Sequence, residues 1–166
     1  MLIQTKIGNL STFNSNGKTF DLLPLEWYEA RKRIFRKQSI GGREVSIKFL
    51  NENPELTEGD VLFEDDTTII AVTILPCDCI VIHPTNMFEM ASVCYEIGNK
   101  HLPLFYEKEA LLIPSDPPLL KLLTAQGYHV SVEKRKLLQP LKTTVSPHDT
   151  AGTTLFSKIM KLTNPA

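Results

Sequence analysis

The pattern of apolar residues changes at Pro76, and this change constrains the fold more than any other feature of the sequence. Residues 1–75 contain short apolar runs separated by turn residues. Val45, Ile47 and Phe49, for example, alternate with polar neighbours, and this period of two is typical of a half-buried β-strand. After Pro76, segments typical of strands and of helices alternate. We therefore expect an all-β part followed by a mixed part.

Residues 1–75 are predicted to form a small antiparallel β domain. Residues 29–40 fit either a helix or a strand, but Gly41-Gly42 and the alternating segment 43–49 follow them directly. Because two glycines between two extended segments favour a tight turn, we interpret this stretch as a hairpin. Further strands are expected at 1–6, 61–63 and 68–75.

Residues 76–142 are predicted to form a ferredoxin-like domain. Strands are expected at 79–83, 104–106, 110–113 and 129–133, and helices at 86–97 and 117–126. Asp116 precedes two prolines, as a helix N-cap often does, and Gly127 stands where the second helix should end. The order β-α-β-β-α-β is that of the split βαβ fold, so the chain is expected to be α+β. Residues 143–166 are polar and are expected to form a flexible C-terminal tail.

Composition excludes several classes of protein. The chain has 166 residues, of which 42% are hydrophobic and 22% charged, which is typical of a globular protein. The net charge of −1 argues against binding to nucleic acid. No apolar run is long enough to cross a membrane, and no signal-peptide pattern opens the sequence. Three cysteines do not suggest a disulfide framework, so we expect a reduced, cytoplasmic protein.

His101 is the first candidate for chemistry. It follows the predicted helix 86–97 after Gly98 and Asn99, two residues that tolerate the positive φ often found at a helix end, and Pro103 prevents continuation. A continued helical turn would place His101 on the apolar stripe of Met87, Met90, Cys94 and Ile97. The spacing leaves two readings open. Either His101 is partly buried and bonded to a carbonyl group, or it is a metal ligand or general base.

The run Tyr95-Glu96-Ile97-Gly98-Asn99-Lys100-His101 resembles the signature Gly-Asn-(Arg/Lys)-His of UreE-type urease accessory proteins, the nickel metallochaperones of urease maturation. The likeness covers nearly the whole chain and is greatest to the ε-proteobacterial type. It implies an N-terminal β domain joined to a ferredoxin-like domain with a variable metal-binding tail. Other segments that carry it are Ile7-Gly8-Asn9-Leu10, Leu25-Glu26-Trp27, Glu58-Gly59-Asp60 and Ile70-Ala71-Val72.

The resemblance also implies the metal site. The signature residue His101 would be the principal ligand at a homodimer interface, where two copies share one Ni(II) ion. His148 would be a second, mobile ligand from the tail. The chain lacks the His-rich tail of some family members, so we expect binding at this central site alone. Zn(II) and Cu(II) are expected to compete for it, because imidazole binds all three ions.

We therefore expect a homodimeric nickel metallochaperone that delivers Ni(II) to apo-urease. Its implied partners are the urease accessory GTPase and the urease apoprotein assembly complex, with the N-terminal β domain as the docking surface. The alternative is a general zinc, copper or nickel buffer with no delivery role. A metal-dependent hydrolase would need a general base beside an open metal position, and no enzyme motif is present. We therefore do not expect an enzyme.

Three other groups could bind metal. Cys77-Asp78-Cys79 offers two thiolates, but structural zinc needs about four protein ligands and the chain has no second cysteine pair. His83 and His129 are each interpreted as residues at the end of a strand. The sequence therefore favours His101 and His148 over these alternatives.

Overall fold

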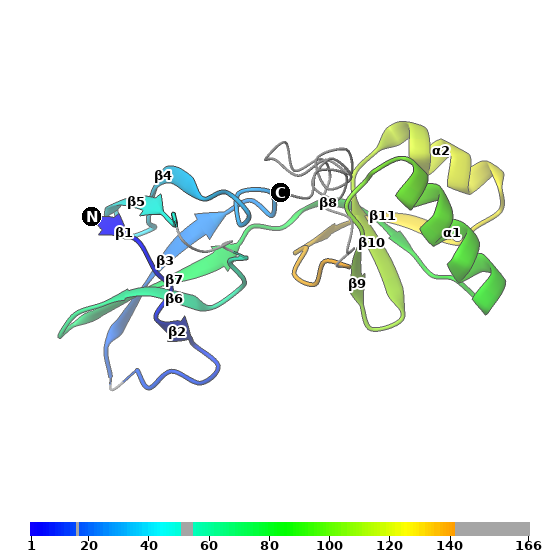
Figure 1. Ribbon diagram of the computed structural model, residues 1–166. Coiled ribbons are helices and arrows are strands. Elements are labelled where there is room, and N and C mark those ends of the chain that lie inside the picture. Colours follow the sequence, from blue (N-terminus) through cyan, green and yellow to red (C-terminus); the bar gives the residue numbers. More distant parts are fainter. Residues whose placement is uncertain (16, 51–54, 142–166) are drawn as a thin grey trace, which may run out of the picture.

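The structure is a computed structural model that describes residues 1–15, 17–50 and 55–141. Figure 1 shows a strand-rich N-terminal part and a C-terminal part in which two helices cover a sheet. Each part has a hydrophobic core of its own. The two parts meet where the chain passes into the strand that begins at Cys77.

The N-terminal part contains two sheets. One has the strand order β1 (Leu2–Ile3), β5 (Glu44–Lys48) and β4 (Ile34–Gln38). The other has the order β2 (Gly8–Asn9), β6 (Asp60–Glu64), β7 (Thr68–Ile74) and β3 (Thr19–Leu25). The predicted hairpin is confirmed, since β4 and β5 pair in antiparallel register. Val45, Ile47 and Phe49 are buried, as their alternation indicated.

The prediction of a purely antiparallel domain is wrong. Strand β1 pairs with β5 in parallel, and β3 pairs with β7 in parallel over seven residues. Parallel neighbours need a long crossover connection, and in both pairs other strands intervene along the chain. Strand β3 contains Pro24 and lies at the edge of its sheet, where a residue without an N–H group is tolerated.

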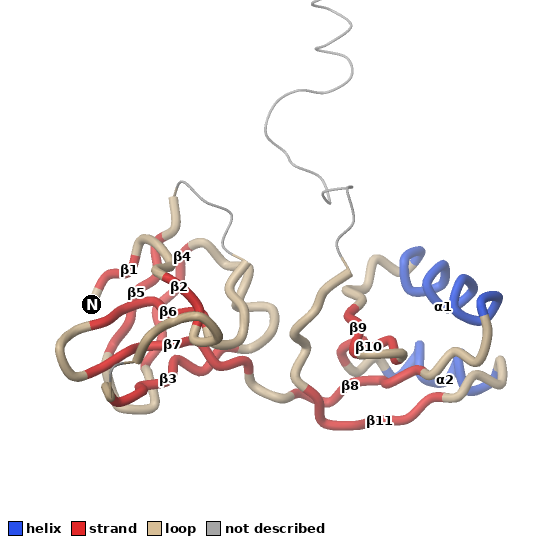
Figure 2. Tube along the Cα trace, turned by 90° about the horizontal axis from the view of Figure 1, so that it is seen from below, coloured by secondary structure: helices blue, strands red, loops and turns tan. Residues whose placement is uncertain are grey.

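The C-terminal part follows the predicted order of elements. It contains β8 (Cys77–Ile82), α1 (Met87–Asn99), β9 (Phe105–Glu107), β10 (Ala110–Pro114), α2 (Pro117–Ala125) and β11 (Val130–Arg135). The strands form an antiparallel sheet in the order β11-β8-β10-β9. Both helices cover the same face of this sheet (Figures 1 and 2). No helix among the described residues is long and apolar enough to cross a membrane.

Side-chain caps fix the starts of both helices. The side chain of Asn86 accepts a hydrogen bond from the N–H of Glu89 at the start of α1. The side chain of Asp116 accepts one from the N–H of Leu119 at the start of α2, as predicted. Gly127 follows α2 with a φ of 81°, also as predicted. These caps satisfy backbone donors that would otherwise lack partners.

The sheet of the C-terminal part has two different faces. Ile80 and Ile82 of β8 point to the helices and share a core with Val93 of α1. The alternate residues Cys79 and Val81 point to the opposite face and pack in a second cluster, composed of Cys79, Val81, Phe105, Leu112 and Leu137. This second face carries no helix in Figure 2.

Trp27 connects the two parts. It is partly buried and packs against the core of the N-terminal part. It also packs against the second cluster of the C-terminal sheet, with its ring centroid 5.7 Å from that of Phe105 in an edge-to-face arrangement. An aromatic pair in this geometry is favourable beyond the area it buries.

A polar contact accompanies Trp27 at the junction. Lys136, which follows β11, donates hydrogen bonds to the Glu58 carboxylate (2.9 Å) and to the Thr73 hydroxyl (3.2 Å). The Ile74 N–H donates to the other Glu58 oxygen at 2.8 Å. Burial raises the pKa of Glu58, but the hydrogen bonds from Ile74, Lys136 and Thr73 outweigh it, so the pKa lies below its usual value. Ionised Glu58 therefore links the end of β7 to the segment after β11.

Candidate metal centre

His101 lies immediately beyond the end of α1. The helix continues through Gly98 and Asn99, and Lys100 is its C-cap. The N–H of His101 donates to the carbonyl of Gly98 at 3.0 Å, and the N–H of Leu102 donates to the carbonyl of Ile97 at 3.3 Å. These two bonds define a Schellman motif with His101 at the C′ position.

His101 itself adopts the left-handed conformation, with a φ of 55°. The prediction that Gly98 and Asn99 supply the positive φ is therefore wrong, because both are helical. The C′ position usually holds glycine, and a residue with a Cβ atom there costs roughly 1–2 kcal/mol. Among the described residues only His101 and Lys108 combine a side chain with a positive φ. Such strained positions cluster at functional sites.

The side chain of His101 is exposed to solvent. Among the described residues its imidazole has no hydrogen-bond or ion-pair partner. The reading in which His101 is partly buried and bonded to a carbonyl group is therefore wrong. An exposed imidazole with an unused nitrogen can bind a borderline divalent ion such as Ni(II).

One imidazole is not a complete metal site. In the parts of the chain that the structure describes, no group of three or more His, Cys, Asp or Glu side chains could hold a metal ion. The remaining sources of protein donors at His101 are a second copy of the chain and the residues outside the described ranges, which include 142–166. His148, the predicted second ligand, lies in that range and outside the described residues.

An exposed strip of residues runs along α1 toward His101. We call it the α1 strip and define it as Phe88, Ala91, Tyr95 and Gly98, which recur at steps of three, four and three. Phe88 is 79% exposed and Tyr95 is 70% exposed. His101 follows Gly98 by three further residues. Two large aromatic side chains are therefore exposed to solvent on one face of α1.

The stripe that we had expected to carry His101 packs elsewhere. Ile97 is fully buried, and Met90 and Cys94 pack partly buried against the core under the helices, whereas Met87 is 86% exposed. His101 therefore continues the exposed face of α1, and the apolar setting predicted for it is wrong. The 3-4-3 spacing of the α1 strip is visible in the sequence. Periodicity alone, however, does not distinguish which of two neighbouring stripes faces the sheet.

Gly98 has no role that contacts within the described part of the chain explain. Apart from its own chain neighbours and the helix backbone, no atom of the described residues would lie within 4 Å of a Cβ atom at this position. A helix with glycine is less stable than one with alanine at the same position by roughly 0.5–1 kcal/mol, so Gly98 weakens the last turn of α1. Glycine is also the residue that lets another backbone approach closely. Its place on the α1 strip, three residues before His101, is consistent with that use.

Cys77 and Cys79 lie close together, and neither is exposed. The sulfur atoms of Cys77 and Cys79 are 3.6 Å apart, on the face of β8 that packs against Trp27 and Leu137. Burial raises the pKa of the Cys79 thiol to about 12 and also raises that of Cys77. A metal ion bound here would have to displace the thiol protons, because the thiolate is the ligand.

Sequence reasoning missed the pairing of His83 with His129. Both side chains are exposed, and the N–H of His83 donates to the carbonyl of His129 at 3.0 Å. The two ring centroids are 5.9 Å apart. Each had been interpreted separately as a residue at a strand end. Only the pairing of β8 with β11 brings them together.

Comparison with known proteins agrees with this architecture. The family model of the UreE urease accessory protein N-terminal domain matches residues 3–75, and that of the C-terminal domain matches residues 77–152. The urease accessory protein UreE of Flavobacterium johnsoniae is 44% identical over 163 residues, which cover 98% of this chain and 99% of that protein. The UreE of Haemophilus influenzae strain PittEE is 40% identical over 145 residues, covering 85% of this chain and 78% of that protein. The UreE of Helicobacter pylori, an ε-proteobacterium, is 38% identical over 153 residues, covering 89% of each.

Nearly the whole chain is thus shared with proteins whose names describe a urease accessory role. The signature that ends in His101 lies within the matched C-terminal domain. The chain belongs to the UreE family of urease accessory proteins.

Proposed function

We propose that this chain is a nickel metallochaperone that delivers Ni(II) to apo-urease during urease maturation. The ion is held by His101 from each of two copies, and His148 from the tail assists. The observation that carries the proposal is the imidazole of His101. It is exposed, has no partner among the described residues, and is held in a left-handed conformation at the end of α1.

The α1 strip supports the proposal that a second copy of the chain contributes to the site. A twofold axis beside His101 would bring each residue near that axis close to its own equivalent, so two His101 imidazoles could meet. Phe88 and Tyr95 would supply buried apolar area, and Gly98 would let the two chains approach closely. The same surface would thus build the dimer and the metal site.

A site of this kind suits a protein that must release its metal. Two imidazoles, assisted by one further residue on each tail, leave the ion less enclosed than a closed site with four protein ligands. Cu(II) and Zn(II) would compete for it, because imidazole sites generally bind Cu(II) most tightly. Selectivity for nickel would then come from metal availability and from the partner protein.

The roles of the three segments of the chain are those that the family resemblance implies. Residues 1–75 form the β domain that docks a partner, and residues 76–142 form a ferredoxin-like domain for metal binding and dimerisation. Residues 143–166 form the tail that carries His148. The partners are the urease accessory GTPase and the urease apoprotein assembly complex, in the cytoplasm.

Urease maturation in cells that express the urease genes tests delivery. Cells with wild-type protein, with His101→Ala, with Lys121→Ala as a matched surface control, and with the gene deleted are grown in nickel-limited medium. Urease activity and urease-bound nickel are then measured. We expect His101→Ala to resemble the deletion and Lys121→Ala to resemble the wild type. Full urease activation after deletion would contradict delivery and favour a general metal buffer.

A further inference from the structure

His83 and His129 are cross-strand neighbours. His83 directly follows β8 and His129 directly precedes β11, and these strands are adjacent and antiparallel. The register pairs Val130 with Ile82, so the next pair along the strands is His129 with His83. The hydrogen bond from the His83 N–H to the His129 carbonyl confirms that this pairing continues beyond the strand ends.

Both imidazoles lie on the face of the sheet that the helices leave uncovered. Side chains alternate between the faces of a strand. Val81 belongs to the cluster opposite the helices, so His83 two residues later points to the same side. Val130 packs against the helix-side core, so His129, the residue before it, points away from the helices. Both side chains are exposed.

The rings are close enough to share an ion. Their centroids are 5.9 Å apart and their planes are inclined by 46°. An ion about 2.1 Å from one nitrogen of each ring lies roughly 3 Å from each centroid, so rings up to about 6 Å apart can reach it. Neither ring has a hydrogen-bond or ion-pair partner among the described residues. We propose that His83 and His129 form a second metal site, separate from His101, for divalent ions that imidazole binds.

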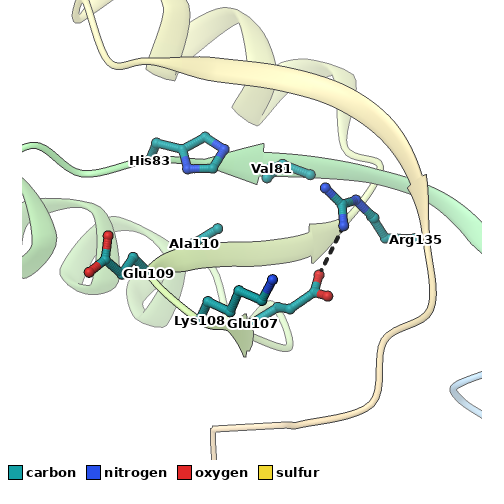
Figure 3. A pocket seen from close by; sticks show the side chains of 7 residues that line it. All are labelled: Val81, His83, Glu107, Lys108, Glu109, Ala110 and Arg135. Carbon is teal, nitrogen blue, oxygen red and sulfur yellow. Dashed lines mark hydrogen bonds and ion pairs between the residues drawn. The ribbon is translucent and has the colours of Figure 1, made fainter.

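A hollow beside His83 gives this site access to solvent. It has a volume of about 490 Å³ and is lined by Val81, His83, Glu107, Lys108, Glu109, Ala110 and Arg135. Figure 3 shows His83 at the end of β8, with Glu109 at the near end of β10. Ala110, the β10 neighbour of His83, has only a methyl group, so no bulky side chain stands beside the imidazole on that strand.

The charged side chains around the hollow show which groups could serve as further metal ligands. Arg135 pairs with Glu107 at 3.2 Å and with Glu133 at 2.9 Å. Glu109 and Lys108 are exposed, and neither has an ion-pair partner in the described part of the chain. No third His, Cys, Asp or Glu there joins the two histidines in a metal-binding group. In this proposal water fills the remaining coordination positions, so the site exchanges its ion readily and prefers Cu(II) to Ni(II).

This pair is separate from His101 within one chain. His83 precedes α1, whereas His101 follows its end. A helix of 13 residues rises about 1.5 Å per residue, so the two sites are separated by about 20 Å along α1. One ion cannot contact both. The structure thus assigns one ion per chain to the His83–His129 pair, in addition to the ion that two chains would share at His101.

Copper titration of the full-length chain tests the pair. In a His101→Ala/His148→Ala variant, which lacks the proposed central ligands, calorimetry with Cu(II) should still give one ion per chain. Pulsed electron paramagnetic resonance should show two coupled imidazoles. Adding His129→Gln should weaken binding at least tenfold and remove one imidazole coupling. Circular dichroism and elution volume should not change, because both positions are exposed.

Two results would overturn the proposal. One is that the His101→Ala/His148→Ala variant binds no Cu(II) at these concentrations. The other is that one ion per chain still binds after His83→Gln and His129→Gln are both added. A separate experiment distinguishes failure of this proposal from failure of the proposed function at His101. His83→Gln/His129→Gln in an otherwise wild-type chain should retain nickel binding at His101, so the two sites can fail independently.

Discussion

Replacing His101 by glycine should make the protein more stable while removing the proposed metal site. Glycine adopts a φ of 55° without strain, which relieves roughly 1–2 kcal/mol. The greater freedom of glycine in the unfolded chain offsets about 0.5–1 kcal/mol of that gain. The net gain of about 0.5–1 kcal/mol should raise the Tm by about 1–4 °C for a chain of this size. His101→Ala retains a Cβ atom and should show no such gain.

The measurement is thermal unfolding of metal-free protein at one fixed concentration, combined with nickel titration by calorimetry. Lys108→Gly is the matched control, because Lys108 has a φ of 56° and lies in the turn between β9 and β10. It should gain stability in the same way but keep nickel binding. The reasoning would be refuted if His101→Gly were no more stable than His101→Ala, or if His101→Gly bound nickel like the wild type.

Three further predictions concern the tail, the α1 strip and the domain junction. His148→Ala should weaken nickel binding only in part in calorimetry, since the pair of His101 imidazoles remains; complete loss would show that His148 is the principal ligand. Tyr95→Glu should shift the protein to monomer in light scattering, because it places a charge on the α1 strip; an unchanged dimer would locate the interface elsewhere. The folded pKa of Glu58 is lowered, so its stabilising effect is present above its ordinary pKa near 4.5 and is lost as the pH falls through the folded value. Acid unfolding of Glu58→Gln should therefore depend less on pH below about 4.5 than that of the wild type; identical pH profiles would refute this role.

Local patterns predicted much of the fold. The alternation of Val45, Ile47 and Phe49 located a strand with a buried face, because period-two burial is a local property. Asp116 and Gly127 marked both ends of α2, because capping depends on neighbouring residues. The parallel pairing of β3 with β7 was not predicted. It joins segments that are distant in the sequence, and Pro24 obscured the strand pattern of β3.

The candidate site also has features that the sequence predicted and features that it did not. The signature pointed to His101, but its left-handed backbone was assigned to Gly98 and Asn99 instead. Residue preference alone does not show how far a helix continues, and α1 runs through both residues before it ends. The pairing of His83 with His129 depends on the register between β8 and β11, which no local pattern encodes.

Nickel calorimetry on wild type and His101→Ala, with the oligomeric state measured in the same samples, tests the central claim most directly. The account predicts a tight class of sites with one Ni(II) per two chains in the wild-type dimer. This class should disappear in His101→Ala, while the dimer persists. Tight binding that survives in His101→Ala, or that saturates equally in a monomeric variant, would contradict a site built from His101 of two copies.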